Sequence, residues 1–173
     1  MEDMAILSDN GAELFPIVDE QGNTIGQATR AQCHGGSRLL HPVVHLHVFN
    51  PAGGLYLQRR PLWKDIQPGK WDTAVGGHVE WGETITEALF REAHEELGLR
   101  DFHPQALPPY VFESAREREL IHPFTTTTDH TPHPSEELDG GRFWTHEAIR
   151  GAIGTGIFTP NFEEEYLRLF AQM

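Results

Sequence analysis

The sequence predicts an α/β (α+β) fold, because apolar strands and amphipathic helices alternate along it without a strict strand–helix–strand rhythm. Its 173 residues suit one domain with a sizeable core. Hydrophobic residues make up 38% of the chain and aromatic residues 10%, which is typical of a globular protein. A turn-rich segment precedes this core. We therefore expect an N-terminal β extension over residues 1–36 and one main domain over residues 37–173.

The first half of the chain is predicted to be mainly β-structure. Alternating or apolar runs bounded by turn residues predict strands at 14–18, 24–29, 43–49, 55–59 and 73–75. The first two flank a turn-forming segment and should pair as a hairpin. One long helix follows at about 84–97, and Gly98 stands where helices commonly end.

The second half is predicted to mix strands and helices. Two paired strands are expected at 110–119 and 120–128, although their boundary is unclear from the pattern. A loop rich in proline and glycine covers 129–141. The expected elements after it are a strand at 142–145 and helices at 146–152 and 161–171.

The formal net charge of −13 restricts the partners. Such a surface repels polyphosphate backbones, so we expect no nucleic-acid partner. No apolar stretch is long enough for a membrane helix, and no signal peptide is apparent. Cys33 is the only cysteine, so no internal disulfide forms, and we expect a cytoplasmic protein. An anionic substrate would need a metal ion or a local basic cluster.

Three carboxylates converge on the long helix. With Ile85 on the buried face, helical spacing places Glu92 and Glu96 on or near that side, and Glu95 beside them. A carboxylate near an interior is costly unless a cation or a donor meets it, and Mg²⁺ or Mn²⁺ prefers such oxygen ligands. The ordinary alternative is an acidic helix face in solvent.

The residues around these glutamates favour the metal. Gly77 is followed after five residues by Glu83 and after seven more by the run Arg91-Glu-Ala-His-Glu-Glu-Leu-Gly-Leu99. This pattern resembles the Nudix box of the Nudix hydrolase superfamily, with Ala93 as the one mild departure. The resemblance implies an α/β/α sandwich with a mixed β-sheet, preceded here by the β-hairpin extension.

The resemblance also implies roles for single residues. Glu92 and Glu96 would be the main ligands of Mg²⁺ or Mn²⁺, Glu95 would assist, and the Gly77 carbonyl would complete the shell. Arg91 and Glu83 would form the internal pair that orients the helix and its loop. The general base varies within the superfamily.

Two residues are candidates for that base. Glu95 lies within the box. Glu137 lies in the loop before Phe143, where some Nudix hydrolases carry a further acidic residue. An exposed loop glutamate without a catalytic role is the ordinary interpretation of Glu137.

A second resemblance concerns substrate and metal binding. The segment Leu55–Trp71 resembles isopentenyl-diphosphate isomerase, a Nudix relative, and Arg60 and Lys64 match positions that grip diphosphate there. That family also binds a second divalent metal through three histidines and two glutamates. The matching residues here are His34, His41, His78, Glu117 and Glu119. Scattered histidines more often make ordinary hydrogen bonds, so this second site is a candidate only.

One position separates hydrolysis from isomerisation. The isomerase requires a cysteine where this chain has Gly76, and glycine cannot transfer a proton through a side chain. We therefore expect a hydrolase that cleaves the diphosphate linkage of a small nucleoside-diphosphate-type or other organic diphosphate substrate. An isomerase-like enzyme and a non-catalytic diphosphate-binding module are the alternatives. Pairing of the N-terminal hairpin between copies would give a homodimer.

Overall fold

The computed structural model describes residues 11–64, 67–133 and 140–172. The chain forms two compact units, which are described separately. Unit 1 comprises Met1–His45, Gly76–Glu92 and Ala106–Phe124, and unit 2 comprises Leu46–Val75, Ala93–Gln105 and Thr125–Met173. In the described part of the chain, no helix is both long enough and apolar enough to span a membrane.

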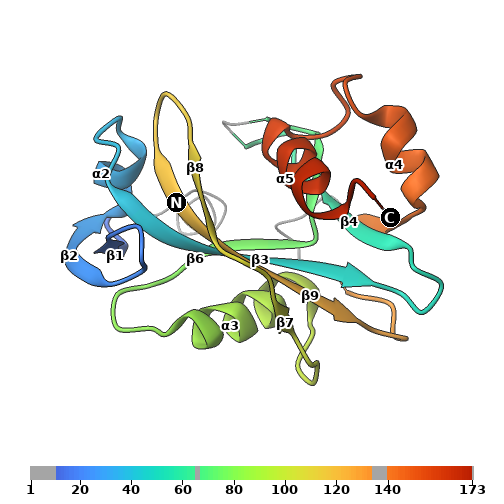
Figure 1. Cartoon of the computed structure of the whole chain (residues 1–173), viewed down its shortest axis with the longest axis horizontal. Helices are drawn as coiled ribbons and strands as arrows, with labels where there is room; N and C mark the ends of the chain where they lie inside the picture. The colour runs from blue at the N-terminus through green and yellow to red at the C-terminus, as the bar shows by residue number, and fades with distance from the viewer. Residues whose placement is uncertain (1–10, 65–66, 134–139, 173) are drawn as a thin grey trace. The chain divides into compact units, whose positions relative to one another are not determined.

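Unit 1 begins with the expected hairpin, β1 (Leu14–Val18) and β2 (Thr24–Thr29), which pair antiparallel as a separate sheet (Figure 1). The Asp19 carboxylate closes the turn by accepting hydrogen bonds from the backbone N–H groups of Gln21 and Asn23. Gly22 adopts the positive φ of 88° that this turn requires. The hairpin therefore folds where its turn residues predict it.

A short helix that sequence reasoning missed, α2 (Arg30–His34), follows β2 directly. Its first turn is closed by a capping box, in which Thr29 accepts from the Gln32 N–H and the Gln32 side chain accepts from the Thr29 N–H. Cys33 is buried against Phe15 and Ile17 of β1. This packing fixes α2 on the hairpin and places His34 at the helix end.

The remaining strands form an eight-stranded sheet. Its central order is β10-β4-β3-β9-β7, with β5 beside β4, β6 beside β3 and β8 beside β9. The strand bounds are β3 (Leu40–Phe49), β4 (Leu55–Arg59), β5 (Trp71–Thr73), β6 (Val75–His78), β7 (Gln105–Ala106), β8 (Tyr110–Glu113), β9 (Arg118–Thr127) and β10 (Gly141–Trp144).

The long predicted helix is α3 (Ile85–Leu97). It begins with a second capping box, because the Thr84 hydroxyl accepts from the Glu87 N–H and the Glu87 carboxylate accepts from the Thr84 N–H. It ends at Gly98, which has a φ of 69°. Both boundaries follow from residues that the sequence displays.

Two C-terminal helices belong to unit 2: α4 (His146–Ala152) and α5 (Pro160–Phe170). The hydroxyls of Thr145 and Thr159 cap their first turns. The apolar face of α5 includes Phe162, Tyr166 and Phe170, all buried. These helices match the predicted positions within one residue at each end.

Two details of the predicted strands were wrong. The single strand expected at 73–75 is two short strands, β5 and β6, with Ala74 between them. The paired strands meet at a turn, because the Ser114 N–H donates to the Glu117 carbonyl and the Ser114 hydroxyl accepts from the Glu117 N–H. The expected boundary at 119–120 therefore lies within β9. Local side-chain hydrogen bonds of this kind are invisible to an alternation pattern.

Candidate active site and histidine cluster

A charged network joins the loop after β6 to α3 in unit 1. Arg91 donates from Nε and Nη2 to the two carboxylate oxygens of Glu83, at 2.6 and 2.8 Å. Its Nη2 also donates to the His78 carbonyl at 3.1 Å. Burial alone would raise the pKa of Glu83, but hydrogen bonds from Arg91 and the Glu80 N–H outweigh it and lower that pKa. Glu83 is therefore a firmly ionised anchor for the helix.

The same guanidinium holds Glu92. Arg91 Nη1 donates to Glu92 Oε1 at 2.7 Å, and the Glu92 side chain is 15% exposed. Gly77 lies against this carboxylate so closely that a Cβ added at Gly77 would overlap it. A glycine is therefore required for the backbone of β6 to approach Glu92. This contact brings together two of the residues that the sequence singles out.

The other two helix glutamates lie further along α3. Glu96 is half-buried and Glu95 is exposed. The fully buried positions of the helix are Ala88, Leu89, Ala93 and Leu97. Ile85, which was expected on the buried face, is only partly covered, and the buried stripe is rotated toward Ala93 and Leu97. Glu92 and Glu96 consequently lie at the edge of the buried face, and both are half-buried.

The expected substrate contacts lie in unit 2. Arg60 follows β4 and lies 3.6 Å from Asp72 of β5, between Arg60 Nη1 and Asp72 Oδ2. The Lys64 ammonium lies 4.8 Å from the ring centroid of Trp63. Both side chains are partly exposed. Glu137, the second candidate for the base, falls outside the described residues.

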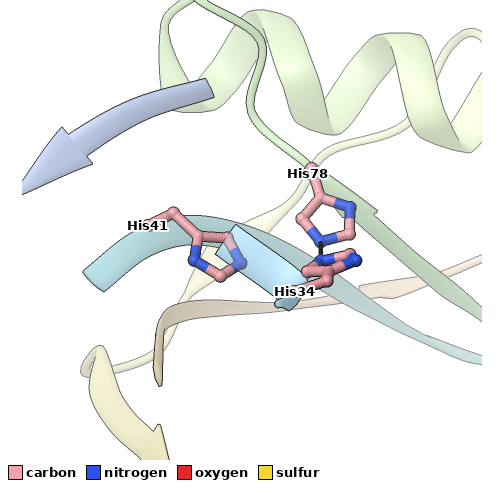
Figure 2. Close-up of side chains that lie close together, drawn as sticks. All are labelled: His34, His41 and His78. Atoms are coloured by element: carbon pink, nitrogen blue, oxygen red, sulfur yellow. Dashed lines mark hydrogen bonds between the residues drawn. The ribbon is translucent and has the colours of Figure 1, made fainter. Parts of the chain in front are cut away.

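Three imidazoles converge in unit 1 (Figure 2). His34 comes from the end of α2, His41 from the start of β3 and His78 from the end of β6. One nitrogen from each lies within 4.8 Å of the others, and the Nε2 atoms of His34 and His78 are 3.1 Å apart. The chain thus brings together three histidines that are 7 and 37 residues apart in sequence.

Two carboxylates complete this histidine cluster. Glu117 Oε2 lies 3.2 Å from His34 Nε2. Glu119 Oε2 lies 3.9 Å from both His41 Nε2 and His78 Nε2. A second set of atoms within 4.8 Å of one another comprises His41, Glu117 and Glu119. All five residues named for a second metal are therefore neighbours.

His41 shows how such a cluster could receive a cation. Its Nδ1 lies 3.0 Å from the Leu39 carbonyl, a contact that requires the proton on Nδ1 and leaves a lone pair on Nε2. That Nε2 atom is fully buried and has no hydrogen-bond partner among the described residues. A buried lone pair without a donor is costly. A divalent cation between His41 and Glu119 would satisfy it.

The surroundings of His41 and His78 favour their neutral forms. Burial lowers the pKa of His41, and the charge of Arg30 lowers it further against the opposing effect of the Leu39 carbonyl. The pKa of His78 lies well below its ordinary value, chiefly because of burial and then because of Arg30 and the neighbouring histidines. Burial raises the pKa of Glu117. Neutral imidazoles are the form that binds metal.

Two residues beside the cluster were not found by sequence reasoning. Phe15 of β1 is fully buried and stacks on His78 and His41. Arg30 of α2 lies over Phe15 and is paired with Glu13. A single apolar residue in a hairpin strand carries no signal that it will contact histidines distant in sequence. Only the docking of the hairpin reveals it.

Comparison with known proteins gives the family of this chain. A model of the NUDIX domain matches residues 39–162, so the chain belongs to the Nudix family. An isopentenyl-diphosphate Delta-isomerase from Agromyces mediolanus is 37% identical over 139 residues, covering 75% of this chain and 67% of that protein. An uncharacterized Nudix hydrolase from Pseudomonas aeruginosa is 35% identical over 141 residues, covering 81% and 83% respectively.

The fold has close structural relatives as well. The crystal structure of DR0079 from Deinococcus radiodurans matches with a TM-score of 0.79 and 27% identity, covering 91% of this chain and 99% of that one. The predicted fold class, a Nudix α/β fold with an N-terminal β-hairpin, is confirmed by this likeness and by the family match. The hairpin lies before the segment that the family model matches.

Proposed function

We propose that this chain is a metal-dependent hydrolase that cleaves a diphosphate linkage in a small nucleoside-diphosphate-type or other organic diphosphate. The observation that carries the proposal is the position of Glu92, which Arg91 fixes against Gly77 on a helix whose box glutamates are all present. A non-catalytic module would have no need to retain this set. The substrate is a small molecule, since the acidic surface disfavours polyanionic chains.

Glu92 and Glu96 are the proposed ligands of Mg²⁺ or Mn²⁺, with Glu95 and the Gly77 carbonyl assisting. The half-buried carboxylates of Glu92 and Glu96 offer the hard oxygen donors that these cations prefer. When bound, the cation would neutralise phosphate oxygens and lower the pKa of a coordinated water. Arg91 and Glu83 position the ligands, because their paired hydrogen bonds connect α3 with the loop before it.

Arg60 and Lys64 are the proposed diphosphate contacts. Both are cations in a chain of strongly negative charge, and both keep exposed surface. The proposed general base is Glu95, which is exposed and able to take a proton from water, with Glu137 as the alternative. Loss of turnover in Glu95→Gln but not in Glu137→Gln would favour Glu95, and the reverse result would favour Glu137.

The histidine cluster is the proposed site of a second divalent cation. Its donors, three imidazoles and two carboxylates, suit Mn²⁺, Zn²⁺ or Fe²⁺. The buried Nε2 lone pair of His41 supports the proposal, because a protein interior rarely leaves such an atom without a partner. Metal analysis of the purified chain tests it. A wild-type chain without bound transition metal after exposure to Mn²⁺, Zn²⁺ and Fe²⁺ would exclude the site.

An isomerase-like activity is the second candidate. It is favoured by the relatives named isopentenyl-diphosphate Delta-isomerase and by the same histidine cluster. It is opposed by Gly76, which places no proton-transferring group where that reaction needs a thiol. The thiol of Cys33 is buried, and burial raises its pKa to about 11, so it is a poor substitute. Hydrolysis therefore remains the leading proposal.

The decisive experiment offers diphosphate compounds, isopentenyl diphosphate among them, to the purified chain with Mg²⁺ or Mn²⁺. Released phosphate or monophosphate indicates hydrolysis, whereas a migrated double bond indicates isomerisation. We expect hydrolysis, and we expect the double variant Glu92→Gln/Glu96→Gln to lose at least about 100-fold in kcat. Glu164→Gln, an exposed site on α5, removes one charge as a control and should leave kcat unchanged. Full activity in the double variant would contradict the proposal.

Two further properties remain predictions. A cytoplasmic location is expected from the single cysteine. The second is a homodimer formed by pairing of β1 or β2 with the same hairpin of another copy. Light scattering of the wild-type chain measures the mass and tests this directly. A monomer at micromolar concentration would exclude it.

A further inference from the structure

The ring of Phe15 is aligned with two of the clustered imidazoles. Its plane makes an angle of 5° with that of His78, with ring centroids 4.6 Å apart. The plane of His41 is inclined by 14° to Phe15, with centroids 5.8 Å apart. Phe15 itself has no exposed surface. One buried aromatic ring therefore lies parallel to two histidines from different strands.

Ring planes matter because an imidazole binds a cation through a lone pair that lies in the plane of the ring. The torsion that sets this plane, χ2 of histidine, has a broad and roughly two-fold preference. The local backbone therefore does not decide where the lone pair points. Packing against a flat neighbour restricts the plane in which that lone pair lies, and Phe15 is nearly parallel to both His78 and His41.

The third histidine approaches from another direction. The plane of His34 is inclined by 49° to His78 and by 50° to His41, whereas His41 and His78 differ by only 18°. Two of the ring planes are thus nearly parallel, and the third crosses them. A cation bound by all three imidazoles needs nitrogen donors that approach from different directions. The planes of His41 and His78 both depend on packing against the same neighbour, Phe15.

Phe15 is well placed to act as that neighbour because it is itself held firmly. It packs in a buried cluster with Ile17, Ala28 and Cys33. The Arg30 guanidinium lies 5.8 Å from its ring centroid and is fixed by an ion pair with Glu13 at 3.1 Å. A ring that is fixed on its own account can fix the rings stacked against it.

From this geometry we propose that Phe15 is a positioning residue of the histidine cluster, setting the planes of His78 and His41 for a divalent cation. The inference rests on the proposed second metal site and adds a residue to it from β1. This strand precedes residues 39–162, which the family model matches. Mutation of the hydrogen-bonding partners of metal ligands commonly lowers metal affinity by 10- to 100-fold, and we expect the lower end of this range for a stacking partner.

The test compares two substitutions in the same buried cluster. Phe15→Leu keeps an apolar side chain but removes the flat ring. Ile17→Val, the matched control, loses one methylene from the same strand and the same buried cluster, and it removes no aromatic ring. Binding of Co²⁺ is followed by its visible absorption spectrum, and Zn²⁺ affinity by competition. His41→Ala identifies the part of the signal that belongs to the cluster.

We expect Phe15→Leu to weaken Zn²⁺ affinity by at least about tenfold and to alter the Co²⁺ spectrum. Ile17→Val should change neither, although both variants lower the melting temperature of the metal-free chain. Phe15→Tyr retains the ring and should restore the spectrum. If Phe15→Tyr does not fold, the comparison of Phe15→Leu with Ile17→Val still decides.

Two failures are distinguishable. Equal affinities and spectra for Phe15→Leu and Ile17→Val, with binding lost in His41→Ala, would overturn the role of Phe15 and leave the metal site intact. A wild-type chain whose Co²⁺ signal is unaffected by His41→Ala would overturn the second site, and the inference with it.

Discussion

Arg91 and Glu83 are joined by two parallel hydrogen bonds, from Nε at 2.6 Å and from Nη2 at 2.8 Å. They are separated by eight residues, with one in the loop and the other on α3, so the pair fastens the helix to the loop that precedes it. Only a planar guanidinium can make both bonds and still reach Glu92 with Nη1. The pair therefore fixes the position of α3 relative to the loop, in addition to pairing two opposite charges.

Replacing Arg91 by lysine should therefore be damaging although the charge is kept. We expect Arg91→Lys to lower kcat by at least about tenfold and stability by about 1 kcal/mol, because the bidentate contact and the bond to Glu92 cannot both be replaced. Turnover and thermal unfolding measure the two effects. Arg168→Lys on α5, whose partner Glu164 lies 3.9 Å away at the surface, is the control. Equal kcat in both variants would contradict this role.

Gly77→Ala should disturb the site through a single methyl group. The new Cβ would overlap the Glu92 carboxylate, so either β6 or that side chain must shift. We expect a loss of about 1–3 kcal/mol in unfolding free energy and a large loss of Mg²⁺-dependent turnover. Gly151→Ala in α4 has open space at its Cβ and should be neutral or stabilising. Normal turnover in Gly77→Ala would show that Glu92 need not lie against the strand.

The buried pair of His47 and Glu165 should matter for stability and not for chemistry. His47 Nε2 lies 2.5 Å from Glu165 Oε2, and the two residues are 0% and 1% exposed. Glu165→Gln removes the charge of one partner and should cost about 3 kcal/mol in chemical denaturation. The neighbouring surface variant Glu164→Gln should cost about 0.5 kcal/mol or less. Similar losses in both would show that the buried pair contributes little.

Cys33 should make stability fall at alkaline pH. Burial, with a smaller effect of the Glu117 charge, raises its pKa from 9.0 to about 11. The folded state binds the Cys33 thiol proton more tightly than the unfolded state does. The resulting contribution to the unfolding free energy is therefore complete below pH 9 and is lost as pH rises toward 11. The unfolding free energy of wild type should therefore drop by about 2 kcal/mol more than that of Cys33→Ala over this range. Parallel pH profiles would contradict a buried, protonated thiol.

Much of the fold was predictable because its boundaries are set by local chemistry. Thr84 and Gly98 mark the ends of α3 in the sequence, and Asp19 and Gly22 mark the first turn. The errors lie where a side chain closes a turn that no pattern displays. Ser114 divides β8 from β9 in this way. Short elements such as α2 carry too few residues for a periodic signal.

The residues of the candidate site also fall into two groups: those that a sequence motif identifies and those that only tertiary packing brings together. A motif with fixed spacing selected Glu83 and Arg91, and the structure brings them into contact. The histidines were selected by resemblance, and the structure places them together. Phe15 was missed, because its relation to His78 arises from the docking of a separate sheet. Contacts between segments distant in sequence are set by tertiary packing.

The bond from Arg91 to Glu92 has a consequence for how a cation would arrive. Glu92 Oε1 already accepts a hydrogen bond from Arg91 Nη1 at 2.7 Å, so an ion that binds this oxygen competes with the guanidinium for its lone pairs. Glu92 therefore has a cationic partner both with and without the ion. The affinity for the ion is lower by the free energy of the hydrogen bond that the ion displaces. Only Nη1 of Arg91 would be released in this exchange, because Nε and Nη2 remain bonded to Glu83. The anchor between the loop and α3 would therefore keep its geometry whether or not an ion is bound.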